Sequence, residues 1–215
     1  MTCIICGSQT ISYQHPKFDM HFHECLTCEA IFKDAKDHIT PTDEKNVYDL
    51  HENSIENRGY VNYLTNFIES AVIPHVTHKP IIALDYGSGP VPVLAQILKE
   101  TFNIPTDIYD PFYAKTPIKD DQTYDLITST EVIEHVKDPI KIFKQFKKHL
   151  KPEGLLAIMT LFHPKDRPSF FNWFYIRDHT HIVFYTPKTL DILAASVGLV
   201  MIDNNGHRHA TFKHR

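Results

Sequence analysis

An apolar run over Ile81–Leu84 ends in an acid and two glycines, in the sequence Asp85-Tyr86-Gly87-Ser88-Gly89-Pro90. An apolar-periodic segment follows directly, which predicts a strand, a tight turn and a helix in succession. Glycine lets the backbone adopt positive φ and approach a ligand closely, and a helix start offers unpaired N–H groups at the positive end of a dipole. The turn is therefore suited to a nucleotide-like ligand. The residues expected to contact that ligand are Asp85, Gly87, Ser88 and Gly89.

Two further apolar segments end in polar residues. The first, Thr106–Tyr109, ends at Asp110, where a nucleotide-binding fold can bond ribose hydroxyls through a carboxylate. The second, Tyr124–Thr130, runs into a polar turn that carries Glu131, Glu134 and His135. An amphipathic helix is expected near 139–150, then a Lys151-Pro152-Glu153-Gly154 turn and a strand over 155–160.

The glycine turn, the ribose acid, the Glu-His segment and the Pro-x-Gly turn occur in an order that resembles class I S-adenosylmethionine-dependent methyltransferases. The resemblance covers roughly Ile81 to the C-terminus. It implies an α/β doubly wound fold with a mostly parallel sheet and with S-adenosylmethionine at the carboxyl ends of the strands. It adds Thr130 and Glu131 to the expected donor contacts, and it implies methyl transfer to a small-molecule or carrier-bound acceptor.

Two alternatives are weighed against this interpretation. A nicotinamide dinucleotide enzyme would need Gly-x-Gly-x-x-Gly, and Pro92 stands at the third glycine position. A non-catalytic module that senses the donor or docks a protein gains support from Val91, where these methyltransferases often carry a third glycine. The many polar groups after the later strands favour the enzyme.

The four cysteines form two pairs at the N-terminus, Cys3-x-x-Cys6 and Cys25-x-x-Cys28. This spacing is typical of a zinc ribbon, in which four thiolates close a tetrahedral, structural site. Disulfides and a redox-active pair are the alternatives. His15, His21 and His23 lie between the pairs and could replace a cysteine ligand.

The composition limits the size of the protein and its partners. A chain of 215 residues with 42% apolar residues can form one substantial α/β core with a small appendage. The net charge of −4 argues against a nucleic-acid partner. No apolar run reaches the length of a membrane span and no secretory signal is recognisable, so a cytoplasmic protein without membrane contact is expected.

The predicted domains are a zinc ribbon over 1–32, a linker over 33–45, a helical lid over 46–75 and a donor-binding domain over 76–215. The ribbon is also a candidate surface for a protein partner. An N-terminal helical segment commonly covers the donor pocket in the family that the chain resembles. Tyr48 and His51, which look less like core residues, are therefore expected to contact the substrate.

The segment 171–185 is rich in aromatic residues, histidine and aspartate, and with the cysteine pairs it resembles a bacterial subgroup of zinc-ribbon methyltransferases. In class I enzymes this region forms part of the acceptor pocket, so Trp173 and Tyr175 are expected to line it. His181 is the first candidate for a general base and His135 the second, because imidazole titrates near neutral pH. Asp178 is expected to orient His181.

A divalent metal ion at the active site is a further hypothesis. Glu131, Glu134, His135 and His181 offer the oxygen and nitrogen ligands that such an ion binds. The Glu-x-x-Glu-His string also resembles that of some quinone-biosynthesis O-methyltransferases.

Overall fold

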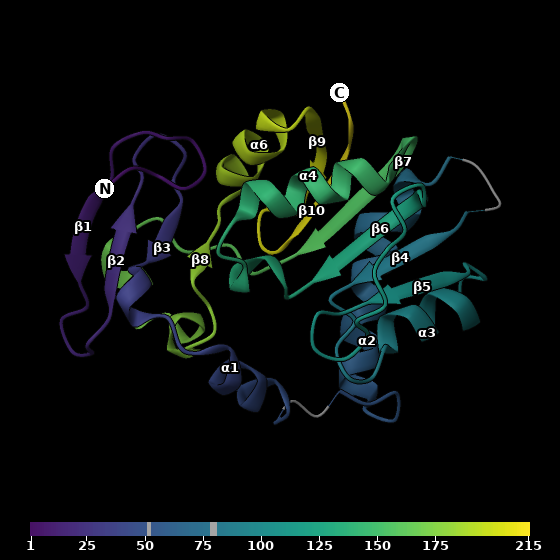
Figure 1. Ribbon diagram of the computed structural model, residues 1–215, viewed down its shortest axis with the longest axis horizontal. Coiled ribbons are helices and arrows are strands. Elements are labelled where there is room, and N and C mark those ends of the chain that lie inside the picture. The colour runs from purple at the N-terminus through teal and green to yellow at the C-terminus, as the bar shows by residue number, and fades with distance from the viewer. Residues whose placement is uncertain (51–52, 78–80) are drawn as a thin grey trace.

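The computed structural model describes residues 1–50, 53–77 and 81–215, which form two sheets (Figure 1). The larger sheet has six strands in the order β5-β4-β6-β7-β10-β9. The pairs β4–β5, β4–β6 and β6–β7 are parallel, whereas β10 is antiparallel to β7 and β9. The strands are β4 (Ala83–Tyr86), β5 (Thr106–Tyr109), β6 (Tyr124–Thr130), β7 (Leu150–Met159), β9 (Leu199–Asn204) and β10 (His209–His214).

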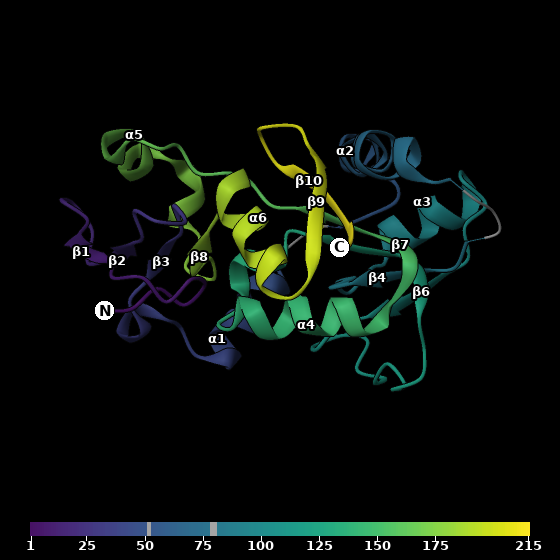
Figure 2. The same ribbon diagram turned by 90° about the horizontal axis from the view of Figure 1, so that it is seen from above.

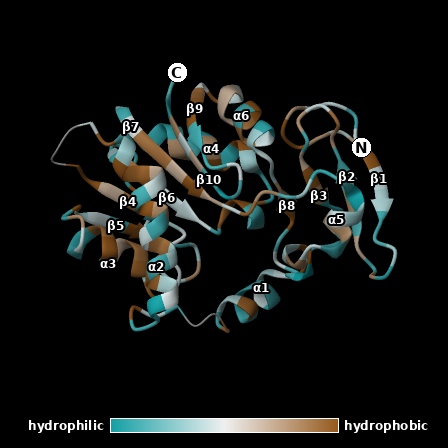
Figure 3. Ribbon diagram, turned by 180° about the vertical axis from the view of Figure 1, so that it is seen from behind, coloured by the Kyte–Doolittle hydropathy of each residue, from teal (hydrophilic) through white to brown (hydrophobic). Residues whose placement is uncertain are grey.

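Helices cover both faces of the larger sheet (Figure 2). One face packs on α2 (Arg58–Phe67) and α3 (Val93–Glu100), and the other packs on α4 (Pro139–His149) and α6 (Pro187–Ser196). A π-helical turn at Ile68–Val72 and a 3₁₀ turn at Ile73–His75 extend α2. This arrangement confirms the α/β doubly wound fold, and the apolar residues gather on the central strands (Figure 3).

The sequence of α4 explains both where it begins and which face is buried. The Asp138 side chain accepts a hydrogen bond from the Lys141 N–H at 2.9 Å, and Pro139 occupies the first helical position. Ile142, Phe143 and Phe146 recur at helical spacing and are buried. The predicted helix over 139–150 is therefore confirmed to within one residue.

The predicted turn over 151–154 is wrong, because these residues belong to β7. Leu150 pairs with Tyr124, and the next regular pair is Leu155 with Leu126. Between these two pairs β6 advances by two residues and β7 by five, so the extra residues of β7 form a bulge. Pro152 cannot donate a ladder hydrogen bond, and a bulge is one of the few places where a strand accepts proline.

The smaller sheet contains the cysteine-rich N-terminal segment and one strand from far along the chain. Its order is β1-β2-β3-β8, with all neighbouring strands antiparallel. The first three strands are β1 (Ile11–Gln14), β2 (His21–Glu24) and β3 (Ile31–Lys33). The fourth, β8 (Val183–Phe184), was not predicted as a partner of the N-terminal segment. We call residues 1–34 with their three strands the ribbon.

Residues 33–45, expected as a linker, contain a 3₁₀ turn at Ala35–Asp37 and the first part of α1 (Pro41–Tyr48). Thr40 caps α1, because its Oγ1 accepts a hydrogen bond from the Asp43 N–H at 3.2 Å. The expected lid, 46–75, includes the end of α1, all of α2 and the turns after it. The remaining helices are α5 (Arg167–Asn172) and short 3₁₀ turns at Ile133–His135 and Phe174–Arg177.

Candidate functional site

A cavity of about 710 Å³ opens where β4, β5 and β6 end. Parallel α/β sheets bind ligands at this edge, outside the carboxyl ends of the strands. The cavity is lined by every residue that the sequence suggested for the donor: Asp85, Gly87, Ser88, Gly89, Asp110, Thr130 and Glu131. His135, Asp178 and His181 line it as well, so donor and catalytic candidates share one space.

The glycine turn leaves β4 in a conformation that favours glycine. Gly87 has φ +85° and Gly89 has φ +67°. A Cβ on Gly87 would lie 2.2 Å from Val132 Cγ2, so a side chain there would collide with the turn after β6. The Gly89 N–H donates to Asp110 Oδ2 at 3.0 Å, which joins the turn to the end of β5.

Asp110 organises the edge of the cavity through both carboxylate oxygens. Its Oδ1 accepts hydrogen bonds from the N–H groups of Phe112 at 2.8 Å and Tyr113 at 3.0 Å. A carboxylate oxygen has more than one acceptor direction, so these bonds leave capacity for ribose hydroxyls.

Asp85, at the end of the neighbouring strand β4, is buried. Burial, reinforced by the charge on Asp110, raises the pKa of Asp85 to about 7, while a hydrogen bond from Thr128 opposes the shift.

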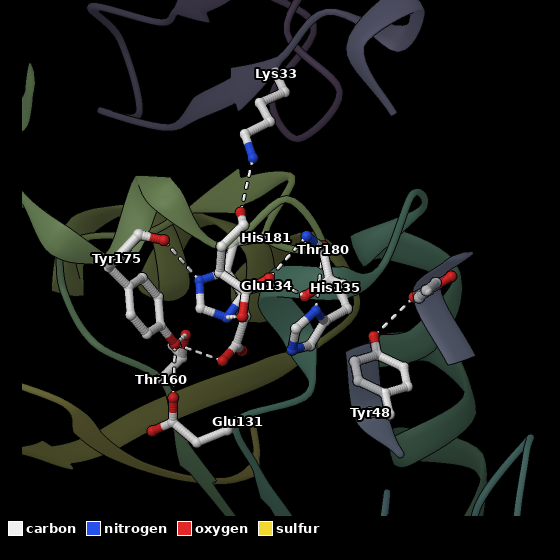
Figure 4. A network of polar contacts seen from close by, with 11 residues as sticks. Lys33, Tyr48, Glu131, Glu134, His135, Thr160, Tyr175, Thr180 and His181 are labelled. Carbon is white, nitrogen blue, oxygen red and sulfur yellow. Dashed lines mark hydrogen bonds and ion pairs between the residues drawn. The ribbon is translucent and has the colours of Figure 1, made fainter. Parts of the chain in front are cut away.

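Glu131 has φ +53°, an uncommon conformation for a residue with a side chain. Its carboxylate is held from two sides. Tyr63 Oη donates to Oε1 and Tyr175 Oη donates to Oε2, each at 2.7 Å. These contacts fix the direction of the Glu131 side chain, as Figure 4 shows for the Tyr175 side. Backbone strain of this kind persists where the surrounding contacts determine the geometry.

Tyr175 Oη also lies against Glu134 Oε1. One hydroxyl has one proton to donate, so the chain from Glu131 through Tyr175 to Glu134 closes when Glu134 carries a proton of its own. Burial, together with the charge on Glu131, raises the pKa of Glu134 well above its usual range. Its second carboxylate oxygen, Oε2, is buried with no hydrogen-bond partner among the described residues.

Backbone carbonyls set the tautomer of both histidines. His181 Nδ1 lies 2.8 Å from the Tyr175 carbonyl oxygen, and His135 Nδ1 lies 3.1 Å from that of Thr180. A carbonyl can only accept, so each Nδ1 carries the hydrogen and the lone pair of the neutral ring is on Nε2. The two ring centroids are 4.7 Å apart.

Asp178 lies beside His181, as the sequence suggested. Its Oδ2 is 3.7 Å from His181 Nε2, and its Oδ1 accepts the Thr180 N–H at 2.8 Å. Burial lowers the pKa of His181 although Asp178 opposes this. Burial acts against ionisation of Asp178, but His181 and Thr180 outweigh it and lower the pKa of Asp178. Burial therefore favours the neutral form of His181, whereas the Asp178 carboxylate favours its protonated form.

The predicted substrate residues separate into two groups. Tyr48 and Tyr175 line the cavity, whereas Trp173 packs against Phe170, Phe184 and the outer side of Tyr175. Trp173 is half-buried and is not among the residues that line the cavity. His51 lies outside the described residues. Lining residues that the sequence did not single out include Glu44, Phe112, Tyr113 and Phe174.

Two groups of side chains have the geometry of metal ligands. Ligand atoms of Cys3, Cys6, Cys25 and Cys28 lie within 4.8 Å of one another, and so do those of Glu134, His135 and His181. The sulfurs of Cys3 and Cys28 are 3.5 Å apart and those of Cys6 and Cys25 are 3.4 Å apart. Tetrahedral Zn–S bonds of 2.3 Å place sulfurs about 3.8 Å apart, so the cysteine group fits zinc.

The curated relatives are ubiquinone biosynthesis O-methyltransferases. The protein from Hydrogenovibrio crunogenus is 29% identical over 96 residues, which cover 40% of this chain and 39% of the relative. The protein from Dinoroseobacter shibae is 28% identical over 136 residues, which cover 59% of this chain and 53% of the relative. The chain thus spans about half the length of these relatives or less.

Two solved structures share the fold. The mitomycin 7-O-methyltransferase MmcR superposes with a TM-score of 0.58 at 11% identity, over 83% of this chain and 59% of its own. LaPhzM superposes with a TM-score of 0.52 at 14% identity, over 81% of this chain and 59% of its own.

In the described part of the chain, no helix has the length and apolarity needed to cross a membrane.

A family model described as a methyltransferase domain matches residues 62–204, which is two thirds of the chain. This range contains the glycine turn, Asp110, the Glu-x-x-Glu-His turn and the loop that carries His181. The chain therefore belongs to the methyltransferase-domain family.

Proposed function

We propose that this protein is an S-adenosylmethionine-dependent methyltransferase that methylates a hydroxyl oxygen of a small molecule. One observation carries the proposal: the glycine turn and Asp110 share a single cavity with His135, Asp178 and His181. The names of the two curated relatives support oxygen as the acceptor atom.

The residues at the glycine turn fit the donor. Gly87 and Gly89 allow close backbone approach, and Asp110 offers its carboxylate to the ribose hydroxyls. Six acids line the cavity against one lysine, which suits the positive sulfonium of the donor. The acids are Glu44, Asp85, Asp110, Glu131, Asp138 and Asp178, of which Asp85 has a pKa raised to about 7, and the lysine is Lys141. When bound, S-adenosylmethionine supplies an electrophilic methyl group.

The chain's own residues then provide position and a base. His181 Nε2 accepts the proton of the acceptor hydroxyl, and Asp178 stabilises the imidazolium that results. Tyr48, Phe112 and Phe174 offer apolar walls for the acceptor. The surplus of carboxylates disfavours a phosphorylated or carrier-bound acceptor, so a neutral small molecule is favoured over the carrier-bound alternative.

Substitution of His181 tests the catalytic assignment. We expect His181→Ala to lower turnover about 10² to 10⁴ fold and to leave donor affinity nearly unchanged, because it removes the base and leaves the glycine turn intact. Labelled methyl incorporation into a panel of phenols and other hydroxyl compounds measures the rate. His179→Ala, an exposed histidine two residues away, is the matched control and should keep the parental rate. Parental turnover in a folded His181→Ala protein would exclude His181 as the base.

A second candidate mechanism uses a divalent ion held by Glu134, His135 and His181, and it rests on their mutual distances and on the unpartnered Glu134 Oε2. Such an ion would bind the acceptor oxygen and stabilise its deprotonated form. If this mechanism operates, a chelator lowers activity and added Mg²⁺ or Mn²⁺ restores it while the zinc content stays constant. Chelation without effect leaves His181 as the base.

We also propose that the four cysteines hold one structural zinc ion. Each close pair combines one cysteine from each end of the ribbon, so the ion would join the two Cys-x-x-Cys segments. The Ile5 N–H donates to Cys3 Sγ at 3.4 Å, a contact that stabilises a ligating sulfur. No open position remains for substrate, so the ion takes no part in the reaction.

A further inference from the structure

The ribbon and the candidate active site are joined by continuous backbone hydrogen bonds. The Lys33 N–H donates to the Ile182 carbonyl at 2.8 Å, and the Ile182 N–H donates to the Glu134 carbonyl at 2.8 Å. Strand β3 also pairs with β8, through Ile31 with Phe184 and Phe32 with Val183. One residue, Ile182, thus lies between the ribbon and the turn that carries Glu134.

Lys33 adds a side-chain contact to this junction. Its side chain reaches from the ribbon toward the cluster around His181 (Figure 4), and Nζ donates to the Asp178 carbonyl at 2.9 Å. Lys33 is only 3% exposed, which is unusual for a lysine. Burial lowers the pKa of Lys33 to about 8, while the carboxylates of Asp178 and Asp37 oppose the shift. Burying an ammonium group is costly unless it is hydrogen-bonded and paired, and the Asp178 carbonyl and the two carboxylates supply this compensation.

The hydrogen bond from Lys33 is accepted by the segment 178–181, which contains His181 and contacts His135. The Asp178 carbonyl that accepts from Lys33 also accepts the His181 N–H at 3.3 Å. Two and three residues on, Thr180 holds His135 through its carbonyl and His181 faces the Asp178 carboxylate. A rotation of the Asp178 peptide would therefore move the carbonyl partner of His135 and the ring of His181 together.

We propose that Lys33 is a positioning residue of the acceptor site, which makes the ribbon a built part of that site rather than a separate docking module. The proposal rests on the proposed function. Two further bonds tie the end of the second cysteine pair to the larger domain: Thr189 Oγ1 donates to the Cys28 carbonyl, and His163 Nε2 donates to the Glu29 carbonyl, each at 2.8 Å.

The test replaces Lys33 by Met, which keeps the length and loses the donor. Lys36→Met is the matched control, since Lys36 is exposed on the neighbouring turn, and Lys33→Arg retains a cationic donor. Misplacement of catalytic groups by about 1 Å can cost roughly a hundredfold. We expect Lys33→Met to lower kcat about tenfold to a hundredfold with unchanged donor Kd, Lys36→Met to match the parent, and Lys33→Arg to recover part of the loss.

A second readout needs no acceptor and therefore separates this proposal from the proposed function. Nitrogen-15 NMR of labelled histidine reports which ring nitrogen carries the proton, and His135→Asn and His181→Asn identify the two signals. We expect both rings as the Nδ1–H form in the parent and a mixture of forms in Lys33→Met. If no acceptor is ever methylated, this shift still supports the role of Lys33 in holding the segment.

Parental tautomers and parental kcat in Lys33→Met would overturn the proposal. Lys33→Gln, whose amide is too short to reach the Asp178 carbonyl, is measured in the same way should Lys33→Met not fold. If neither variant folds by circular dichroism, Lys33 is a folding residue and the proposal is wrong.

Discussion

At the scale of single residues, Gly87 and Gly206 offer a clean comparison. Both have positive φ, +85° and +68°, but a Cβ on Gly87 would meet Val132 at 2.2 Å and a Cβ on Gly206 would meet no atom within 4 Å. Left-handed backbone alone costs alanine roughly 1–2 kcal/mol. We expect Gly206→Ala to lose about this much free energy of unfolding and Gly87→Ala to lose more, together with donor affinity. Denaturant unfolding and donor titration measure both, and equal losses in the two variants would refute the close packing at Gly87.

Asp85 makes a prediction about pH. Because burial raises its pKa to about 7 in the folded protein, Asp85 is protonated there and ionised in the unfolded chain between about pH 4 and pH 7. The folded state binds more protons over that range, so the free energy of unfolding falls as the pH rises, by at most about 1.4 kcal/mol per pH unit from this group. Urea unfolding of the donor-free protein should show this slope, and Asp85→Asn should reduce it. An unchanged slope in Asp85→Asn would assign the effect to another group.

Residue types were enough to predict most of the residues that line the cavity, but not the hydrogen bonds that orient their side chains. Acids and glycines after apolar runs predicted the residues that line the cavity at the ends of β4 and β5, and His135, Asp178 and His181, which line it as well, were recognisable by residue type. The hydrogen bonds from Tyr63 and Tyr175 to the Glu131 carboxylate were not predictable, since they join three segments that are distant in the sequence. Trp173 packs on Phe170 and Phe184 and does not line the cavity, and its sequence does not reveal this because aromatic residues in a loop pack on one another as readily as they line a pocket.

At the scale of secondary structure, the zinc assignment yields a prediction for the ribbon. We expect one zinc ion per chain in purified protein and its loss in the double variant Cys25→Ser, Cys28→Ser, since two thiolates cannot replace four. In that variant the small sheet should lose order, including β8, which pairs with β3. Elemental analysis and amide hydrogen exchange over residues 1–34 and 183–184 measure the two effects. Zinc retained by the double variant would rule out this ligand set.

The predictable elements share a property that the missed ones lack. β5, β6 and α4 are apolar or amphipathic segments bounded by proline, aspartate or a polar turn, so local sequence defines them. Strand β8 has two residues and exists because β3 lies beside it, about 150 positions earlier in the chain. The β7 bulge likewise depends on its pairing with β6, and Lys151-Pro152-Glu153-Gly154 alone is indistinguishable from a turn.

At the scale of the whole molecule, the two sheets lie side by side, and β8 of the smaller sheet lies on the side that faces the larger sheet (Figure 1). The ribbon shares one buried apolar cluster with the larger domain, in which Cys28 and Phe32 pack with Tyr185 and Leu190. A boundary at residue 32 therefore describes the sequence but not the packing. In the proposed function, the ends of β4 and β5 build the donor side of the cavity, and the acceptor side depends on contacts with the ribbon.

Calorimetric titration with S-adenosylmethionine tests most directly whether this cavity binds the donor and where. The parent should bind one equivalent. Asp110→Asn, which keeps an oxygen for Phe112 and Tyr113, should bind about tenfold to a hundredfold more weakly, because a charged hydrogen-bond acceptor is worth roughly 1.5–3 kcal/mol. His181→Ala, on the acceptor side, should bind with nearly the parental Kd. A parent that binds no S-adenosylmethionine, or an Asp110→Asn protein that binds it like the parent, would contradict the account.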